Sequence, residues 1–272
     1  MSSTLRADVA LVQAGLARSR AHAAELIRSG RVSEAARPVT KPAQLVSVPG
    51  LTSSDTMLQV TPDPTDHDYA SRGALKLLGA LSDFGGEMIE ITGQHCLDLG
   101  ASTGGFTDVL LRRGAVSVTA IDVGHGQLID RLRVDPRVQV IEGFNVRDLT
   151  RADLTHPPAL IVGDLSFISL RLILPAVAAV MEPRTQALLL VKPQFEVGKE
   201  RLGAGGLVRD DALRLEAVEQ VKAAGRQLGL TVRAETPSCL PGASGNHEYF
   251  VLFERDSISE PETNADHLGG TA

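Results

Sequence analysis

The sequence predicts an α/β protein whose large domain is a mainly parallel, seven-stranded sheet with an antiparallel last strand, preceded by a small basic module. From residue 94 onward, short apolar runs alternate with helical patterns, which is typical of strands joined by crossover helices. The runs are apolar throughout, as in parallel strands that are covered on both faces. Residues 1–60 hold seven Lys and Arg against four Asp and Glu, whereas the remainder holds 20 against 29. This asymmetry indicates that one end of the chain handles a polyanion.

The basic module, residues 1–60, begins with two predicted helices. Apolar residues in LRADVALVQAG recur at helical spacing, and SRAHAAELIRSGRV runs from a candidate capping serine to Gly30. The module also carries five candidate arginines, namely Arg6, Arg18, Arg20, Arg28 and Arg31. Two interpretations stay open from charge alone: a solvated helix pair, or a surface whose arginines contact backbone phosphates.

Two segments are expected to lack regular structure. Residues 61–68, TPDPTDHD, combine two prolines with three aspartates and are typical of a linker. Residues 257–272 are acidic, polar and without periodicity, so we expect a disordered tail. The large domain is accordingly predicted to span residues 69–256, starting with a helix in YASRGALKLLGAL.

The large domain has six strand candidates followed by one more. They are HCLDLG, VSVTAID, VQVI, ALIVGD, ALLLVK and LTVRAE, and helices are predicted at 105–113, 124–133, 168–181 and 210–228. The last run, HEYFVLFER, leaves no room for a helix before it and is therefore predicted to pair antiparallel. Ligands of such sheets bind at the carboxyl ends of the strands.

The loop after the first of these strands, CLDLGASTGGFTDVL, is a candidate ligand site because glycines allow backbone to approach a ligand closely. A dinucleotide fingerprint needs a glycine where Ser102 stands, so that interpretation is disfavoured. Asp98, two residues before Gly100, instead favours an S-adenosylmethionine site, with Ser102, Gly104 and Gly105 as the other cofactor-binding candidates of the turn. A glycine-rich turn without a ligand is the alternative.

Two residues at later strand ends fit the same ligand. Asp122 ends the second strand and can accept from both ribose hydroxyls, a role it would share with dinucleotide enzymes. Asn145 follows the third strand, where adenine contacts arise.

Charged residues also stand at the ends of the central strands. Asp164 follows the fourth strand, Lys192 follows the fifth, and Glu248 begins the last strand at the same edge of the sheet. Lys76 lies on the preceding helix. Each has an ordinary explanation, such as a helix cap or a solvated face, but their joint occurrence beside the glycine loop predicts a catalytic set.

The composition excludes several classes of protein. The only cysteines are Cys96 and Cys239, so neither a disulfide framework nor a zinc site is expected, and we predict no metal. No signal peptide is recognisable, and no apolar run approaches the roughly 20 residues of a membrane span. We therefore expect a soluble, cytoplasmic protein.

The N-terminal residues RADVALVQAGLARSRAHAAELIRSGRV resemble the RNA-binding module first known from a small-subunit ribosomal protein, in which an Arg-rich helix pair packs on a small sheet. The resemblance implies a small α+β fold. It weakens after Val32, where an Asn-Gly turn usually follows and this chain has SEAARPVTKPAQLV. The resemblance is therefore a weak basis for the sheet part of this α+β module, and a modest RNA affinity is expected.

The motifs SRGALKL, LDLGASTGGFTDVLL, IVGDLSFISL, LLVKPQFEVG and GNHEYF resemble the TlyA (hemolysin A-like) family of ribosomal RNA 2′-O-methyltransferases. The resemblance implies a class I methyltransferase fold and a catalytic tetrad of Lys76, Asp164, Lys192 and Glu248. It also implies S-adenosylmethionine as the methyl donor and a cytidine ribose in small-subunit, and often large-subunit, ribosomal RNA as the acceptor, either in naked RNA or in ribosomal subunits. Leu75 departs from the residues that relatives often carry, without touching the tetrad.

The chemistry of such a set leaves some roles open. Lys192 either accepts the proton of the ribose hydroxyl or stays charged and stabilises the developing alkoxide. The loop after it, PQFEVGKERLGAGGLVRD, is interpreted as a mobile lid or a disordered connector, and Phe195 either stacks on a flipped base or belongs to the core. The rival functions are a nicotinamide-dependent oxidoreductase, a hemolysin-like membrane-acting protein and a non-catalytic ribosome-binding protein.

Overall fold

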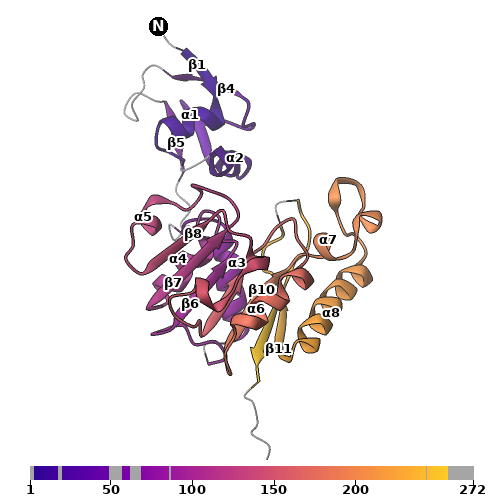
Figure 1. Ribbon diagram of the computed structural model, residues 1–272. Coiled ribbons are helices and arrows are strands. Elements are labelled where there is room, and N and C mark those ends of the chain that lie inside the picture. Colours follow the sequence, from indigo (N-terminus) through magenta and orange to yellow (C-terminus); the bar gives the residue numbers. More distant parts are fainter. Residues whose placement is uncertain are drawn as a thin grey trace, which may run out of the picture. The chain divides into compact units, whose positions relative to one another are not determined.

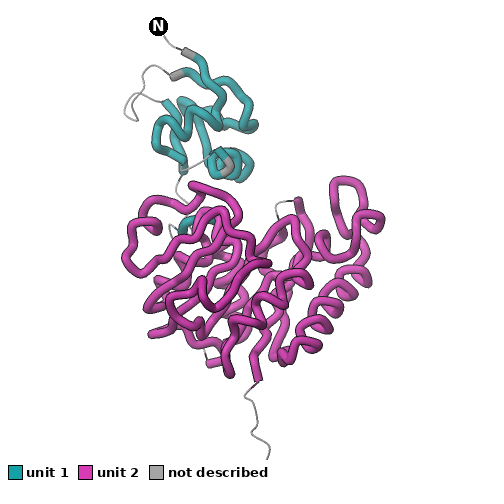
Figure 2. The backbone as a smooth tube through the Cα atoms, viewed as in Figure 1, with its two compact units in different colours: residues 1–71 teal, residues 72–272 magenta. Residues whose placement is uncertain are grey.

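The computed structural model describes residues 3–17, 20–48, 57–61, 69–85, 87–242 and 244–256. The chain divides into two compact units, residues 1–71 and residues 72–272 (Figure 2). The predicted tail, Arg18 and all of the predicted linker except Thr61 lie outside the described residues. Each unit has its own apolar core.

The first unit is a small α+β module (Figure 1). Its helices are α1 (Ala7–Gln13) and α2 (Arg20–Arg28). Strand β1 (Ser3–Arg6) pairs with β4 (Leu45–Val48), while β2 (Val32–Glu34) pairs with β3 (Arg37–Pro38) and β5 (Leu58–Val60), all antiparallel. Both helices bury one apolar face against the strands, so Leu11, Ile27, Val32 and Val46 share one core.

The strands of this module pair although the sequence lacks the usual Asn-Gly turn. The expectation that the sheet part is doubtful is therefore corrected. Glu34 pairs with Arg37, so the β2–β3 hairpin closes through the two residues Ala35 and Ala36. Both have positive φ, 46° and 66°, as a type I′ turn requires. Alanine is strained in this region by roughly 1–2 kcal/mol per residue, and the surrounding sheet offsets that cost.

The second unit is a seven-stranded sheet in the order β11-β12-β10-β9-β6-β7-β8. Its strands are β6 (His95–Leu99), β7 (Ser117–Asp122), β8 (Val138–Glu142), β9 (Leu160–Gly163), β10 (Gln186–Val191), β11 (Leu230–Pro237) and β12 (Tyr249–Arg255). Strands β6 to β10 are parallel, and β12 lies antiparallel between β10 and β11. The predicted architecture, including the antiparallel last strand, is confirmed.

Helices cover both faces of this sheet. They are α3 (Gly73–Asp83), α4 (Gly105–Arg112), α5 (Asp130–Arg133), α6 (Leu174–Val180), α7 (Pro193–Glu196) and α8 (Asp211–Gln227), with short 3₁₀ turns η2 (Val146–Asp148), η3 (Arg151–Asp153), η4 (Leu170–Leu172), η5 (Lys199–Arg201) and η6 (Ala204–Gly206). Helices α6 and α8 pack with Leu97, Leu189 and Phe253 in the core of one face. Helices α3 and α4 contact each other, and α4 lies on the opposite face, where it reaches β6 and β7.

Two predicted helices are shorter than expected. In the segment 124–133 only Asp130–Arg133 is helical, because Gly124 donates its N–H to Asp122 and Gly126 adopts a positive φ. In the segment 168–181, η4 precedes a separate helix α6 that has a proline in its first turn. Proline lacks the N–H that an uninterrupted helix would need there.

Candidate active site

The glycine loop connects β6 to α4 and is shaped by close approaches. Gly100 has φ +82°, and a Cβ there would lie 2.9 Å from the carbonyl oxygen of Asp164. Gly104 caps α4 with φ +100°, and a Cβ there would lie 2.3 Å from Leu132 Cδ1. Both positions therefore require glycine; Gly100 brings the loop against the segment that follows β9, and Gly104 brings it against α5.

Asp98 lies under this loop as a carboxylate that is only 1% exposed. Its Oδ2 accepts a hydrogen bond from Thr107 Oγ1 at 2.6 Å, while its Oδ1 is buried without a partner. Burial, opposed by the Thr107 hydrogen bonds and reinforced by Asp164 and Asp122, raises the pKa of Asp98 to about 7. A buried acceptor that lacks a donor is the feature expected where a ligand cation binds.

The other predicted cofactor residues flank the loop. Asp122, at the end of β7, accepts hydrogen bonds from the backbone N–H groups of Ser102 at 2.8 Å and Gly124 at 2.7 Å. Ser102 has a positive φ of 49° and donates from Oγ to Gln127 Oε1 at 3.1 Å. Asn145 is exposed and caps η2 by accepting from Arg147 N at 3.1 Å. Gly105 is the first residue of α4.

Lys192 directly follows β10 and is 7% exposed. Its ammonium lies 2.5 Å from Asp164 Oδ1 and donates a hydrogen bond to Ser166 Oγ at 2.7 Å. Strands β9 and β10 are neighbours, with Leu189 opposite Gly163, and this register brings the residues after each strand together. The adjacency that strand order predicted for Asp164 and Lys192 is therefore present.

Lys76 and Glu248 form a second, more deeply buried pair. Lys76 Nζ on α3 donates to Glu248 Oε2 at 2.6 Å, and their side chains are 10% and 2% exposed. Glu248 directly precedes β12, whose Tyr249 lies opposite Val191, the last residue of β10. Gly242 leaves room for this carboxylate, because a Cβ there would lie 2.3 Å from Glu248 Oε1. The four residues that were predicted to form a catalytic set thus lie at one edge of the sheet as two lysine–carboxylate pairs.

Three residues of this site were missed by the sequence reasoning: Thr107, Ser166 and Gln194. Ser166 stands two residues after Asp164, and Gln194 two residues after Lys192, with its Nε2 3.4 Å from Glu248 Oε1. The signal for Ser166 was the polar residue within the apolar DLSFISL string. Thr107 lies on the first turn of α4, nine residues after its partner.

The two phenylalanines near Lys192 contact each other. Phe195 on α7 is half-buried, and its ring centroid lies 5.4 Å from that of Phe167. Phe167 is 91% exposed and has a positive φ of 65°. Phe195 therefore belongs to no closed core, although its stacking on a base stays a prediction.

The loop that was interpreted as a lid is tied to the strand end beside it. Asn246, 2% exposed, accepts from Val208 N at 2.9 Å and donates to Gly206 O at 3.0 Å. Val197, Val208 and Ala217 form a small apolar cluster beneath the loop. The mobility of the loop stays a prediction.

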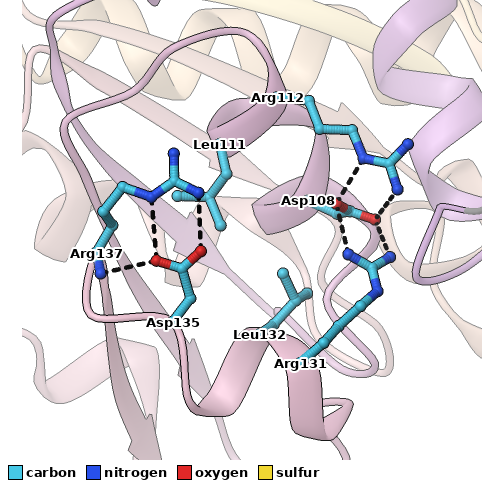
Figure 3. A pocket seen from close by; sticks show the side chains of 7 residues that line it. All are labelled: Asp108, Leu111, Arg112, Arg131, Leu132, Asp135 and Arg137. Carbon is cyan, nitrogen blue, oxygen red and sulfur yellow. Dashed lines mark hydrogen bonds and ion pairs between the residues drawn. The ribbon is translucent and has the colours of Figure 1, made fainter.

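A separate charged cluster lies around α4 and α5 (Figure 3). Asp108, 2% exposed, binds Arg112 at 2.9 Å and Arg131 at 2.5 Å, while Arg137 binds Asp135 at 2.8 Å. These residues line a surface pocket together with Leu111 and Leu132. Opposite charges are paired across it, so we assign it a structural role.

In the first unit, the predicted arginines differ in their surroundings. Arg6 and Arg20 both bind Asp8, at 3.0 Å and 2.9 Å, and hold the pKa of that carboxyl well below its usual range. Arg31 donates to Thr61 O at 2.9 Å, and Arg28 is exposed at the end of α2. Arg6 and Arg20 are therefore oriented by an internal carboxylate.

Among the described residues, no helix is long and apolar enough to cross a bilayer. Within the same ranges, no group of His, Cys, Asp and Glu has the arrangement of a metal site.

Comparison with known proteins agrees with this architecture. A model of the FtsJ-like methyltransferase family matches residues 69–255, and a model of the S4 domain matches residues 5–51. A relative from Mycobacterium tuberculosis, 16S/23S rRNA (cytidine-2′-O)-methyltransferase TlyA, is 48% identical over 251 residues, covering 92% of this chain and 90% of the relative. Hemolysin A of Brachyspira hyodysenteriae is 41% identical over 186 residues, covering 68% and 76%. The solved structure of a hemolysin candidate from Streptococcus thermophilus has a TM-score of 0.73 and 35% identity, covering 96% of this chain and 92% of that one.

Proposed function

The chain belongs to the FtsJ-like methyltransferase family, and we propose that it transfers a methyl group from S-adenosylmethionine to the ribose 2′-hydroxyl of a cytidine in ribosomal RNA. Its relatives in this family include proteins called TlyA and hemolysin A. The family predicted from the sequence motifs is confirmed. The observation that carries the proposal is the Lys192–Asp164–Ser166 contact set at the strand ends, next to a glycine loop whose buried Asp98 has a free acceptor atom.

The residues of the glycine loop fit S-adenosylmethionine. Asp98 Oδ1 lacks a donor, and the α-ammonium of a methionine moiety is a donor of the required charge. Asp122 is already oriented by two backbone N–H groups, and each carboxylate oxygen keeps a lone pair for a ribose hydroxyl. Asn145 is exposed beside η2, available to an adenine edge. When bound, this group supplies an electrophilic methyl on a sulfonium.

Lys192 is assigned the electrostatic role at the reacting oxygen. An ammonium has three N–H donors, and here it contacts Asp164 and Ser166. A third N–H is left to donate to the ribose oxygen. That oxygen would take the methyl group as the carbon–sulfur bond of the donor breaks to leave a neutral thioether, and the hydroxyl proton would pass to solvent water. This geometry favours an anchor for the developing alkoxide over a general base.

Lys76 and Glu248 are assigned to positioning the nucleotide. The two charges are buried and compensate each other, so the pair is proposed to form a rigid, charged surface against the nucleotide rather than to accept a proton. Holding the 2′-oxygen in line with the methyl group can supply a large part of the acceleration.

The S4 domain is assigned to RNA binding. Arginines that contact phosphates give affinity without reading sequence, and Arg28 is exposed at the end of α2. Arg6, Arg20 and Arg31 are proposed to share that role, with the first two held by Asp8. We propose both ribosomal subunits as substrates, since the mycobacterial relative is named for 16S and 23S rRNA. We also propose that the protein acts in the cytoplasm.

The proposal is tested by incubating the protein with each purified ribosomal subunit and radiolabelled S-adenosylmethionine, then digesting the RNA with alkali. Ribose methylation blocks cleavage at the modified nucleotide, so the label is expected in an alkali-resistant dinucleotide with cytidine on its 5′ side. Label released as a mononucleotide would indicate base methylation and contradict the proposal. Lysis of liposomes without any methyl transfer would favour the hemolysin alternative instead.

A further inference from the structure

Helix α7 follows Lys192 without a spacer and carries a buried carboxylate that the proposed reaction does not use. Lys192 is the N-cap of α7, and Glu196 is its last residue. The side chain of Glu196 is only 1% exposed. A carboxylate withdrawn from water to this extent must be compensated by donors, and the identity of the donors indicates its role.

The donors to Glu196 come from the segment that carries Asp164 and Ser166. Glu196 Oε2 accepts from Ser169 Oγ at 2.5 Å and from Arg171 Nε at 3.2 Å, and Oε1 accepts from Leu170 N at 2.7 Å. Arg171 Nη2 also donates to the backbone carbonyl of Glu196 at 3.0 Å. One buried carboxylate therefore joins the segment after β9 to the segment after β10.

The same short helix has a second contact, on the side of Glu248. Gln194 Nε2 lies 3.4 Å from Glu248 Oε1, which is a long hydrogen bond. Within four residues, α7 thus touches the segment that follows Asp164 and Ser166 and the carboxylate of Glu248, with Lys192 at its start. Of the two contacts, the Glu196 contact is the stronger, because it is charged, buried and threefold.

We propose that Glu196 is a positioning residue that fixes the separation and orientation of Asp164, Ser166 and Lys192 by locking the two strand-end segments together, with Gln194 extending the lock to Glu248. The inference rests on the proposed methyl transfer. Glu196 touches neither donor nor acceptor and acts only through the contacts of Lys192. A misplacement of about 1 Å in a reacting group can cost about a hundredfold in rate, so a loosened lock is expected to lower the rate of the chemical step.

The test compares Glu196→Gln with the wild type in single-turnover methyl transfer to the ribosomal subunit that the wild type modifies, at saturating S-adenosylmethionine. Glutamine preserves the volume but removes the charge that Arg171 and Ser169 face. We expect the single-turnover rate constant to fall roughly 10- to 100-fold, with the Kd for S-adenosylmethionine changed by less than about twofold. An unchanged rate constant would overturn the proposal.

Asp108→Asn is the matched control. It also removes a buried, arginine-bound carboxylate (Figure 3), so it is expected to cost comparable stability, yet its partners lie on α4 and α5. The rate constant of Asp108→Asn is expected to stay within about twofold of the wild type. A loss in both variants alike would mean that stability, not positioning, accounts for the effect.

A second variant tests the route of the coupling. Ser166→Ala removes the hydrogen bond of Lys192 that the lock is proposed to align. In that background Glu196→Gln should cost clearly less than it does in the wild type, because the two changes act on one contact set. Fully additive losses would contradict an action through Ser166 and Lys192.

Hydrogen exchange separates a failure of this inference from a failure of the proposed function. If the wild type transfers no methyl group, the proposed function fails, but the Leu170 N–H should still exchange faster in Glu196→Gln than in the wild type. Exchange that is unchanged in the variant would show that Glu196 does not hold this segment.

Discussion

Binding of S-adenosylmethionine should depend on pH through Asp98. Burial raises the pKa of this carboxyl from 3.8 to about 7 in the ligand-free protein, and a ligand ammonium pairs only with the ionised form. The affinity is therefore expected to rise as pH increases towards about 7. Above about pH 8 the amino group of the ligand loses its own proton, so the affinity falls again.

The size of the effect follows from the fraction of ionised Asp98. With a pKa of about 7, roughly 3% is ionised at about pH 5.5 and half at about pH 7, so the Kd should be about 15-fold lower at the higher pH. Isothermal titration across this range measures it directly. Asp98→Asn should bind more weakly at about pH 7 and show a nearly flat profile. A wild-type Kd that does not change with pH would refute the role of Asp98.

The same raised pKa has a consequence for stability. Below pH 3.8 Asp98 is protonated in both the folded and the unfolded chain, and its contribution to stability is fully present. That contribution is lost as pH rises through about 7, because only the unfolded chain releases the proton easily. Each pKa unit corresponds to about 1.4 kcal/mol. Ligand-free Asp98→Asn should therefore melt higher than the wild type at about pH 8, and this advantage should shrink as pH falls and disappear below pH 3.8.

Three further predictions concern folding. Replacing Ala35 and Ala36 by Asn and Gly should raise the unfolding free energy of the first unit by about 1–2 kcal/mol in thermal melts, and an unchanged midpoint would contradict the type I′ turn. Lys76→Met should lower the free energy of unfolding by about 3–5 kcal/mol, as measured in urea, because it leaves Glu248 buried and unpaired. The double variant with Glu248→Gln should lose less than the sum of the two single losses, and simple additivity would argue against the pair. Because the pKa of Asp8 is lowered, its contribution to stability is present above pH 3.8 and is lost as pH falls. Asp8→Asn should therefore lower stability by about 1 kcal/mol at neutral pH and by clearly less at about pH 2, as measured by urea unfolding at each pH.

The positions at strand ends could be predicted from sequence because a parallel sheet has few possible geometries. Once the runs ending in Asp164 and Lys192 are read as neighbouring strands, both side chains must lie at one edge. Glu248 follows from the same rule applied to an antiparallel strand. Their pairing required only topology, which the alternation of strands and helices encodes.

The residues that support them could not be predicted, because loop conformation depends on tertiary contacts. The polar Ser166 stands out within DLSFISL, but nothing local indicates that it turns towards Lys192 or that Glu196 reaches back to Leu170. The hairpin at Ala35–Ala36 is a converse case, since local preference argued against a turn that the rest of the sheet enforces. Local signals therefore place the groups proposed to react, and the packing of distant segments decides what holds them.

The measurement closest to the central claim is methyl transfer by Lys192→Ala beside the wild type, on ribosomal subunits that lack the modification. We expect an alkali-resistant, cytidine-containing dinucleotide from the wild type and a rate lower by a factor of about 100 or more in the variant, while the Kd for S-adenosylmethionine stays close to wild type. Methyl transfer by Lys192→Ala at the wild-type rate would contradict the assignment of the strand-end lysine as the anchor of the reacting oxygen.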